Sequence, residues 1–551
     1  IQTQEPIPSN RTKFSLSTDS KLKKSAHLNQ NITLSKRTNL NFGGQFSHNE
    51  GYYKNAFHSQ KIGGETNYSG RLKLDYKATE NLGLMVLVDG NSLSNNGYPY
   101  YNLSSPGNKI SYNRESAYER DMLTTGIKAD WQTDLFSFKS VSSYQNLDDL
   151  QQIDQDFSPA DMLFVEQNRE HHLFSQEFNL SANITDNLEL VTGAFGFYQL
   201  RDMQVNVFYE EDAVEAYHLQ GEKEKDKTYA QNTRGIAGFG QLKRSNLFLQ
   251  GLDITLGLRY DYEVDQMDYN YQETMLGSTS QINDFNHQLR FSEWLPKFAL
   301  HYRWNKKFVS FLSLAKGYKS GGFNTTFFVP EDEKFSPSFS YNYEGGFKYR
   351  SKYLSANVSI FYIDWKDQQV YQMVQIGEEG RKRRLLKNAG ETVSKGAELE
   401  LKVRPVQNIS TFLNAGYTHA TFEKYVKDPE EEIEYSGNFI PYIPRYTFST
   451  GFNYRYVFTN FIFEEVRLHM AYNGVGKHFW NNDNTIKQNY YGLLNGSVTA
   501  AFNNLQVSVW GKNLTDETYS AFMFEMGRST FAQKSLPMRL GITVKANISN
   551  Y

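Results

Sequence analysis

The chain has 551 residues, of which 15% are aromatic and none is cysteine, and its formal net charge at pH 7 is −3. The absence of thiols excludes cysteine catalysis, disulfides and thiolate-bound metal clusters, and the small net charge gives no sign of a nucleic-acid partner. The mean hydropathy is −0.62 and no apolar run reaches the roughly 18 residues that a membrane-spanning helix needs, so a helical membrane protein is excluded, whereas a transmembrane β-barrel is not.

Apolar and polar residues alternate with a period of two along most of the chain. The stretch RLKLDY places Leu72, Leu74 and Tyr76 on the face opposite Arg71, Lys73 and Asp75, and LDITLGLRYDY repeats the pattern from Leu252 to Tyr262. LQVSV at 505–509 and MRLGITVKANI at 538–548 continue it to the end of the chain. One apolar and one polar face per strand is typical of transmembrane barrels, in which Lys or Arg on the lipid face costs about 2–4 kcal/mol near the midplane. A soluble β-sandwich also alternates, so this pattern alone leaves both folds open.

The lengths of the connections favour the barrel. Short polar turns are predicted at 35–39, 77–81, 131–134, 184–187, 243–246, 303–307, 349–353, 404–408, 457–460 and 502–504. Longer polar segments, predicted as loops, separate the hairpins, for example at 90–119, 147–167, 203–230 and 262–289. With an opening strand near Arg11–Thr18 and a closing strand from Met538, the pattern predicts an all-β, antiparallel transmembrane barrel of about 22 strands, with short periplasmic turns and long extracellular loops.

A barrel of about 22 strands encloses a lumen too wide for its own side chains to fill, and barrels of this size are found plugged. Every segment from Arg11 onward is assigned to a strand, turn or loop, so residues 11–551 are predicted to be the barrel. We expect residues 1–10, which begin IQTQEP, to be the end of a plug or linker, with the plug upstream of Ile1 or in another chain.

Several motifs then resemble those of TonB-dependent outer-membrane receptors. LAKGYKSGGFN at Leu314–Asn324 is similar to the family's signature strand and loop, NYEGGFK at Asn342–Lys348 follows it, and GKNLTDETYS at Gly511–Ser520 is similar to the penultimate-strand motif. Further matches occur in family order at 51–55, 174–178, 395–400 and 441–448. The family-motif residues are Gly317, Tyr318, Gly321, Gly322, Phe323, Asn324, Asn513, Leu514 and Tyr519.

The resemblance implies a plugged receptor in the outer membrane of a Gram-negative bacterium. Such receptors import a bulky, scarce ligand with energy from the TonB–ExbB–ExbD complex, which acts through the plug. The predicted ligand is a ferric siderophore. The same barrel could import a vitamin or a glycan, and a barrel without its own plug could be a passive pore or a scaffold in a larger complex. Lipid and lipopolysaccharide are expected neighbours, and a nucleic acid is not.

Ligand contacts are expected in the extracellular loops. Tyr98, Tyr100 and Tyr101 could stack on a planar ligand, with packing between loops as the alternative. Arg381, Arg383 and Arg384 belong to an RKRR cluster, predicted to lie in a loop, that could bind an anionic ferric chelate, with lipopolysaccharide contact or solvation as alternatives.

Other chemistry has weaker sequence support. Adjacent His171 and His172 point to opposite faces of a strand and cannot readily share a metal. The acidic run Glu430–Glu432 could bind calcium through its oxygens, although a solvated charge run is the preferred explanation. No resident cofactor is predicted. No phosphate-binding loop, nucleophile elbow or zinc-protease motif occurs, so the chain is not predicted to be an enzyme.

Overall fold

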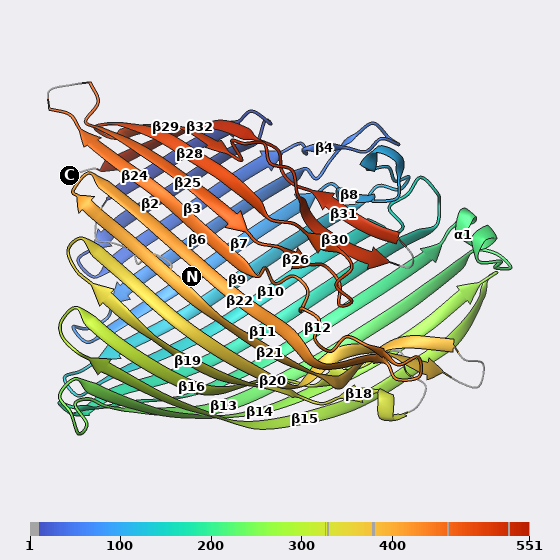
Figure 1. Cartoon of the computed structure of the whole chain (residues 1–551), viewed down its shortest axis with the longest axis horizontal. Helices are drawn as coiled ribbons and strands as arrows, with labels where there is room; N and C mark the ends of the chain where they lie inside the picture. Colours follow the sequence, from blue (N-terminus) through green and yellow to red (C-terminus); the bar gives the residue numbers. More distant parts are fainter. Residues whose placement is uncertain are drawn as a thin grey trace.

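The strands of this chain join into a single closed wall (Figure 1). The computed structural model describes residues 10–325, 327, 330–376, 381–459, 462–526 and 529–549, without the side chains of residues 375, 376, 381–383 and 549. Its main sheet contains 23 strands, of which the two-residue β23 (Ile433–Glu434) pairs only with the end of one neighbour. The remaining 22 strands form an antiparallel closed barrel, as the sequence predicts.

The barrel strands run in chain order around the wall. They are β1 (Arg11–Asp19), β2 (Lys24–Ser35), β3 (Thr38–Asn49), β6 (Glu65–Lys77), β7 (Leu82–Asn95), β9 (Ala117–Gln132), β10 (Phe136–Asp154), β11 (Leu163–Thr185), β12 (Leu188–Tyr209), β13 (Lys223–Arg244), β14 (Leu252–Met275), β15 (Ser278–Arg303), β16 (Phe308–Lys319), β19 (Ser338–Arg350), β20 (Leu354–Ile376), β21 (Arg381–Val406), β22 (Ile409–Asp428), β24 (Tyr446–Val457), β25 (Glu465–Val475), β28 (Tyr491–Phe502), β29 (Leu505–Lys512) and β32 (Arg539–Ser549).

The first and last strands close the ring. β1 pairs with β2 on one side and with β32 on the other, with Phe14 opposite Ala546 and Leu16 opposite Val544. Closure removes the two sheet edges that an open sheet of this size would expose, which is why a barrel can stand in lipid with its backbone hydrogen bonds satisfied.

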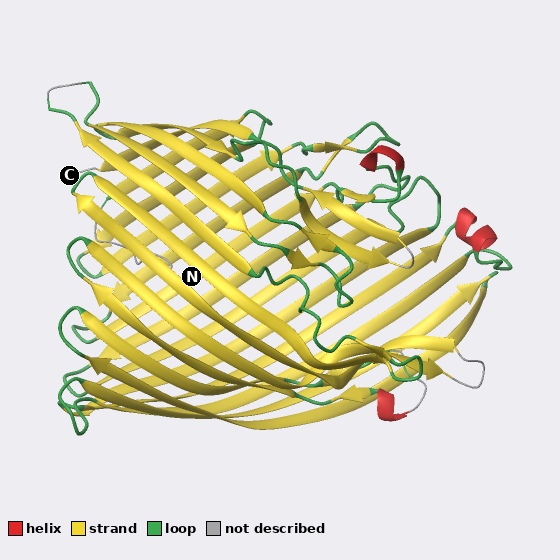
Figure 2. Cartoon of the chain, viewed as in Figure 1, coloured by secondary structure: helices red, strands yellow, loops and turns green. Residues whose placement is uncertain are grey.

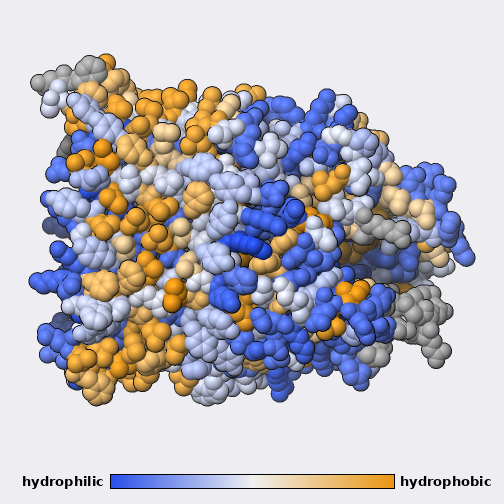
Figure 3. Space-filling model, in the orientation of Figure 1, coloured by the Kyte–Doolittle hydropathy of each residue, from blue (hydrophilic) through white to orange (hydrophobic). Residues whose placement is uncertain are grey.

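The two faces of the wall differ in polarity. On β14 the outward Leu256 and Leu258 are 56% and 47% exposed, whereas the inward Thr255 and Asp265 are buried. Apolar side chains gather on the outside of the half that carries the short turns, and polar side chains cover the half that carries the long loops (Figure 3). The apolar band is the surface that meets lipid, and the polar half extends beyond it.

Short turns lie at one end of the barrel and long connections at the other (Figure 2). All the predicted short turns are found at the first end, except that Asn460 of the turn at 457–460 is outside the described residues. The long connections hold the remaining small elements: β4 (Tyr53–Lys54), β5 (Lys61–Ile62), β8 (Tyr100–Asn102), η1 (Pro106–Asn108), α1 (Glu211–Ala216), β17 (Gly322–Phe323), η2 (Pro330–Asp332), β18 (Lys334–Phe335), β23, β26 (His478–Phe479), β27 (Lys487–Gln488), β30 (Ser520–Met526) and β31 (Ser529–Lys534). In the part of the chain that is described, no helix has the length and apolar character to cross a membrane.

The prediction of a long loop at 262–289 is wrong. β14 continues to Met275, residues 276–277 form a tight turn, and β15 begins at Ser278. Outward residues such as Gln266 and Asp268 are polar because this hairpin projects beyond the apolar band, so the loss of apolar residues marks the end of the lipid contact and not the end of the strand.

The wall is interrupted between β15 and β16. These strands pair only from Arg303 to Lys297. The next residue is Pro296, which has no N–H to donate to a neighbouring strand. Above this point the connection at 320–337 lies against the lumen side of β15, where Phe323 and Phe327 pack on Phe285.

Candidate functional site

Aromatic side chains from five extracellular connections meet at the barrel mouth. We call this set the mouth cluster; its members are Tyr98, Tyr100, Phe157, Tyr442, Trp480, Phe522, Phe524 and Phe531. They come from the connections at 96–116, 155–162, 429–445, 476–490 and 513–538. The cluster therefore joins segments that lie far apart in the sequence.

Tyr100 is central in the mouth cluster. Its ring centroid lies 5.1 Å from that of Phe157 and 5.1 Å from that of Phe524, both in edge-to-face geometry. Tyr98 is stacked on it with a centroid distance of 6.4 Å. Edge-to-face and offset-stacked pairs are the favoured arrangements of aromatic rings, so the loops are held together by specific ring contacts as well as by burial.

A second group of rings extends the cluster across the mouth. Phe522 is stacked with Tyr442 at 5.9 Å and makes an edge contact with Trp480 at 5.8 Å. The indole Nε1 of Trp480 is buried and has no hydrogen-bond partner among the described residues. Tyr442 is 51% exposed, so this side chain can be reached from the mouth although it stacks on Phe522.

Backbone pairing fixes the loops that carry these rings. β31 pairs with both β30 and β8, so the connections at 96–116 and 513–538 share one small sheet (Figure 1). The hydroxyl of Tyr53 donates to the carbonyl oxygens of Lys534 and Ser535 at 2.7 and 2.8 Å, which ties in the connection at 50–64. Burial raises the pKa of Tyr53 to about 12, so its hydroxyl remains a donor at neutral pH.

Tyr98 and Tyr100 also line a cavity of about 600 Å³ on the lumen side of the wall, near the closure of β1 and β32. The cavity wall includes Asp19, Tyr52, Tyr98, Tyr100, Tyr118, Trp510, Lys512, Leu536 and Arg539. A cavity of this volume with aromatic walls and a few polar groups matches the usual character of small-molecule sites.

Charges in this cavity are close to one another. Arg539 Nη1 lies 3.6 Å from Asp19 Oδ2, and its guanidinium lies 5.6 Å from the ring centroid of Tyr52. Asp19 Oδ1 also accepts the backbone N–H groups of Lys21 and Lys23, which fixes the carboxylate. The Arg539 guanidinium is thus held in place and faces the cavity with donors that a carboxylate or catecholate oxygen could accept.

The tyrosines of the site stay protonated at neutral pH. Burial raises the pKa of Tyr52, Tyr98 and Tyr100. The Tyr98 hydroxyl accepts a hydrogen bond from Gln151 Nε2 at 3.0 Å, which leaves its own proton free to donate. These rings can therefore stack on a planar ligand and hydrogen-bond to it without carrying charge.

The three tyrosines predicted from the sequence occupy two environments. Tyr98 and Tyr100 lie at the mouth, as described, whereas Tyr101 is only 7% exposed and belongs to a packed core with Ile62, Ile110 and Tyr112. Its ring is covered by Lys534 Nζ at 5.3 Å from the centroid. Tyr101 therefore supports the loop that presents Tyr98 and Tyr100.

The RKRR cluster does not lie in a loop. Residues 381–384 open strand β21, paired with the end of β20, because the β-ladder continues above the apolar band. The side chains of Arg381 and Arg383 are outside the described residues. Arg384 is exposed, with its guanidinium 4.0 Å from the ring centroid of Tyr371.

Arg384 lies near the mouth cluster. Its guanidinium packs on Tyr371, whose carbonyl oxygen accepts the Tyr425 hydroxyl at 2.8 Å. That hydroxyl in turn accepts a hydrogen bond from Asn482 Nδ2 at 3.4 Å, in the connection that carries Trp480. The structure thus brings Arg384 to the same mouth as Tyr100, through the connection at 476–490 and the contact of Trp480 with Phe522, although a sequence separation of this size gives no hint of it.

The residues predicted as weaker metal candidates have partners of other kinds. His171 and His172 face opposite sides of β11, and His172 pairs with Glu170 and Tyr144. The acidic run lies in a turn in which Asp428 Oδ1 accepts the N–H groups of Glu430 and Glu431. Across the described ranges, no group of three or more His, Asp or Glu side chains is arranged to hold a metal ion.

The motif at 314–324 holds the connection at 320–337 inside the lumen. A Cβ at Gly321 would lie 2.3 Å from the Phe335 carbonyl oxygen, and one at Gly322 would lie 2.7 Å from the Phe335 ring. Asn324 Nδ2 donates to the carbonyl oxygens of Asp332 and Leu386, and Oδ1 accepts the Leu386 N–H at 3.0 Å. Only glycine fits the close approach, and the amide fixes the loop to β21.

The remaining motif residues also serve the wall. Gly317 and Tyr318 lie in β16, and Phe323 packs in the core beside Phe285. Asn513 Nδ2 donates to the carbonyl oxygens of Glu517 and Leu536, closing the turn after β29, where Leu514 follows. Tyr519 stacks on Tyr491 at a centroid distance of 3.9 Å.

Sequence reasoning missed Phe522, Trp480, Tyr442 and Arg539. Trp480 carried a usable signal, because tryptophan is rare in this chain and here falls in a polar connection between strands. The others carried none, since their proximity depends on how separate loops fold over the mouth.

Together these features define a class: an outer-membrane β-barrel transporter with an aromatic extracellular mouth. Residues 86–514 match the family described as TonB dependent receptor-like, beta-barrel, and the chain belongs to this family, whose members lie in the outer membrane.

Individual relatives are consistent with this assignment. The pesticin receptor of Yersinia enterocolitica is 29% identical over 297 residues, which is 53% of this chain and 41% of that receptor, so the match spans less than half of the relative's length. The ferric yersiniabactin uptake receptor FyuA from Yersinia pestis superposes with a TM-score of 0.84 at 20% identity, covering 99% of this chain and 81% of that one. The siderophore receptor PiuA from Acinetobacter baumannii gives a TM-score of 0.81 at 11% identity, covering 99% and 82%. At these identities the structural likeness establishes the fold.

Proposed function

We propose that this protein is the barrel of a receptor that imports a ferric siderophore across the outer membrane, driven by the TonB–ExbB–ExbD complex. Siderophore receptors are among the proteins of the same fold, and the pesticin receptor matches over part of the sequence. The observation that carries the proposal is the mouth cluster with Arg384 beside it.

The chemistry of the mouth favours a planar, anionic ligand. Tyr98, Tyr100 and Tyr442 offer neutral ring faces for stacking, and Arg384 offers a permanent positive charge with donors in a fixed plane. A ferric chelate with aromatic or heteroaromatic groups and net negative charge satisfies both requirements. A neutral glycan would use the rings and leave the charge without a partner.

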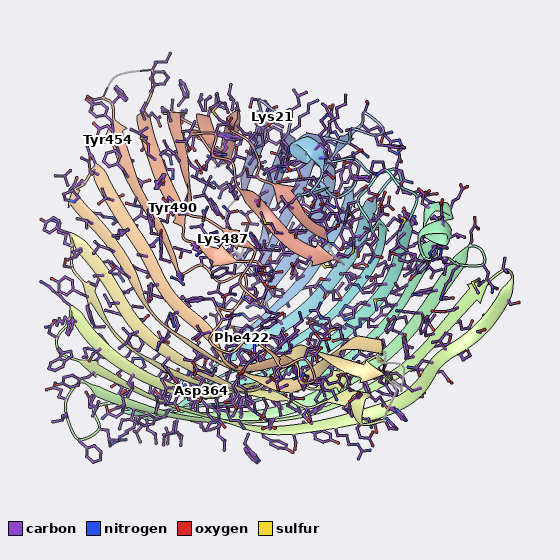
Figure 4. All side chains as sticks on the ribbon, turned by 45° about the vertical axis from the view of Figure 1, so that its right-hand side comes forward. Lys21, Asp364, Phe422, Tyr454, Lys487 and Tyr490 are labelled. Carbon is purple, nitrogen blue, oxygen red and sulfur yellow. The ribbon has the colours of Figure 1, made fainter. Side chains whose placement is uncertain are left out.

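Energised import also requires a plug, which the described residues of the wall do not supply. A lumen of 22 strands is too wide for its own side chains to fill. In the proposal, a plug from an upstream segment or another chain occupies the lumen and contacts TonB, and the polar lumen face of the wall receives it. Figure 4 shows the side chains that project from both faces of the wall. In that view Tyr454 of β24 marks the short-turn end, and Lys487 of β27 lies farther toward the mouth.

The proposal can be tested by uptake in a bacterial strain that lacks its own siderophore receptors. The full-length gene product is expressed under iron limitation, and radiolabelled ferric chelates are supplied as a panel of aromatic anionic and aliphatic neutral forms. We expect uptake of an aromatic anionic chelate that stops when TonB is deleted. Arg384→Gln should reduce this uptake severalfold, whereas Arg37→Gln, in a short turn at the far end, should not. Uptake of cobalamin or an oligosaccharide alone would overturn the siderophore assignment.

A passive pore is the alternative from another class. Conductance of the full-length protein in planar bilayers separates the two, because a plugged receptor conducts little and an open barrel of this width conducts steadily. A large, constant conductance would contradict energised import.

A further inference from the structure

Two arginines stand on the outer face of the barrel where the apolar band ends. Arg234 of β13 lies two residues before the outward Ile236, which is 66% exposed, and Arg290 of β15 lies four residues before the outward Trp294, which is 57% exposed, so both arginines are on the long-loop side of these residues. Both arginines are exposed. Each arginine is next in the chain to a buried inward residue, Thr233 or Phe291, so the arginine side chains point outward.

The two arginines flank one residue of the strand between them. Arg234 is the register partner of Val264, and Val264 is the register partner of Arg290. Two strand spacings of about 4.8 Å therefore separate their backbones by about 10 Å. Val264 is only 7% exposed although it faces outward, so neighbouring side chains of the outer face cover it.

Aromatic rings mark this position as the membrane interface. Tyr198 is the register partner of Arg234 on the other side, and the rings of Tyr260 and Trp294 lie 4.7 Å apart below Arg290. Tyrosine and tryptophan collect where a barrel leaves hydrocarbon for the head groups. The long-loop end is the extracellular end, so this interface belongs to the outer leaflet.

Neither guanidinium has a carboxylate partner among the described residues. The one polar contact found for them is the hydrogen bond from Arg290 Nη2 to Gln288 Oε1 at 3.2 Å. By contrast Lys366, on the outer face of β20, pairs with Asp364 at 3.3 Å and with Glu391 at 2.6 Å. The charges of Arg234 and Arg290 are therefore available to a partner in the membrane.

We propose that Arg234 and Arg290 form a binding site for the phosphate groups of an anionic lipid in the outer leaflet, clamped over Val264. Arginine donors match phosphate oxygens in a two-pronged arrangement, and the aliphatic stems can lie along the apolar surface while the charged ends reach the head groups. The site continues the lipid-facing band upward, so the occupant is a lipid and not a soluble anion.

The experiment compares lipid retained by purified variants. Full-length protein is extracted from outer membranes in mild detergent, and bound lipid phosphate is measured by native mass spectrometry. We expect wild-type protein to retain phosphorylated lipid, and Arg234→Gln with Arg290→Gln to bind it about thirtyfold more weakly, from the combined effect of two interfacial charges. Lys395→Gln is the matched control, because Lys395 is a single outward cation beside Tyr362.

Heat-modifiability on gels checks that each variant is folded, and only folded protein is scored. Unchanged lipid retention in the folded double variant would overturn the proposal. So would equal thermal stabilisation of the wild type by inorganic phosphate and by the phosphorylated lipid in nanodiscs, since that result describes a soluble-anion site. An equal loss in Lys395→Gln would show a general effect of surface charge and would also overturn it.

Discussion

Tyr100 contacts the rings of Tyr98, Phe157, Phe522 and Phe524, and its place inside the mouth cluster is the basis of a prediction at the residue scale. Replacing Tyr100 by alanine should weaken binding of an aromatic ferric chelate about three- to tenfold, because a ring pair contributes about 0.5–1.5 kcal/mol. Tyr100→Phe should retain most of the affinity. Fluorescence titration of the full-length protein measures both.

Tyr217→Ala is the matched control for Tyr100, since Tyr217 is an exposed extracellular tyrosine that contacts only Tyr209 among the aromatic pairs found in the described residues. Equal losses in the Tyr100 and Tyr217 variants would show that general loop hydrophobicity, and not the mouth cluster, governs binding.

We expect His478 to make the mouth sensitive to acid. Its ring lies 4.7 Å from that of Trp480, and burial lowers its pKa, with the hydrogen bond to the Gly476 carbonyl opposing this. A histidine with a lowered folded pKa contributes stability above its unfolded pKa of about 6.5 and loses that contribution as the pH falls. We expect amides at 476–490 to exchange faster at pH 5 than at pH 7.5, after correction for intrinsic rates.

His478→Gln should remove this pH dependence, and His58→Gln should leave it unchanged, because the His58 ring bonds the Asn113 carbonyl in another loop. Identical exchange of the wild type at both pH values would contradict the assignment of the effect to His478.

At the scale of elements, Asn324 is one of several side chains that anchor the connection at 320–337, beside Gln369 and Asn388. Asn324 is 7% exposed and makes three hydrogen bonds that join η2 and β21. Asn324→Ala removes the partner of the buried bond to the Asp332 carbonyl, at about 1–3 kcal/mol, and the partners of the half-buried Leu386 N–H and carbonyl, at a smaller cost because water can reach them. We expect this connection to be cleaved faster in limited proteolysis while the barrel stays folded.

Asn357→Ala is the control for this element, because Asn357 is half-buried in the wall, away from this connection, and its described bond is to Glu400 on the neighbouring strand. Proteolysis of the Asn324 variant at the wild-type rate would mean that the glycines and Phe323 hold the connection without the amide.

Strands were easier to predict than their ends. The period of two follows from lipid on one side and water on the other, so it is visible wherever both solvents touch the wall. Above the lipid, Gln266 and Asp268 of β14 are polar on the outer face although the ladder continues, and the same reason places Arg384 in a strand. Periodicity measures the solvent of each face, and cannot report where backbone pairing stops.

The members of the mouth cluster could not all be predicted, because the cluster depends on contacts between loops that no local sequence pattern indicates. Tyr98 and Tyr100 were predicted because three tyrosines stand close together in one polar segment. Phe522 and Tyr442 reach the same cluster from other loops, and their approach is set by the small sheet of β8, β30 and β31. The sequence could indicate which aromatic residues are candidates for the mouth, but not which of them contact one another.

At the scale of the whole molecule, lipid contacts the outer face of the barrel and water the lumen face, so the two faces should tolerate charged substitutions differently. The pairing of β1 with β32 leaves the 22-strand wall without an open edge, so within the apolar band each residue of a wall strand faces either lipid or lumen. A charge added on the lipid face of the band must be desolvated, whereas one added on the lumen face stays among polar groups. The effect of a charged substitution on stability should thus depend on which face of the wall the residue occupies, and not on the position of that residue in the chain.

Leu258→Lys and Gln241→Lys test this contrast. Leu258 faces outward from β14 and is 47% exposed. Gln241 faces the lumen from the neighbouring strand β13, and its register partner is Gly257, the residue before Leu258. We expect Leu258→Lys to lower the free energy of unfolding in lipid vesicles by about 2–4 kcal/mol, and Gln241→Lys to change it by no more than about 0.5 kcal/mol. Urea titration of the reconstituted protein measures both. Equal destabilisation by the two lysines would mean that the outer face of β14 does not contact hydrocarbon, and would remove the basis for placing this wall in the membrane.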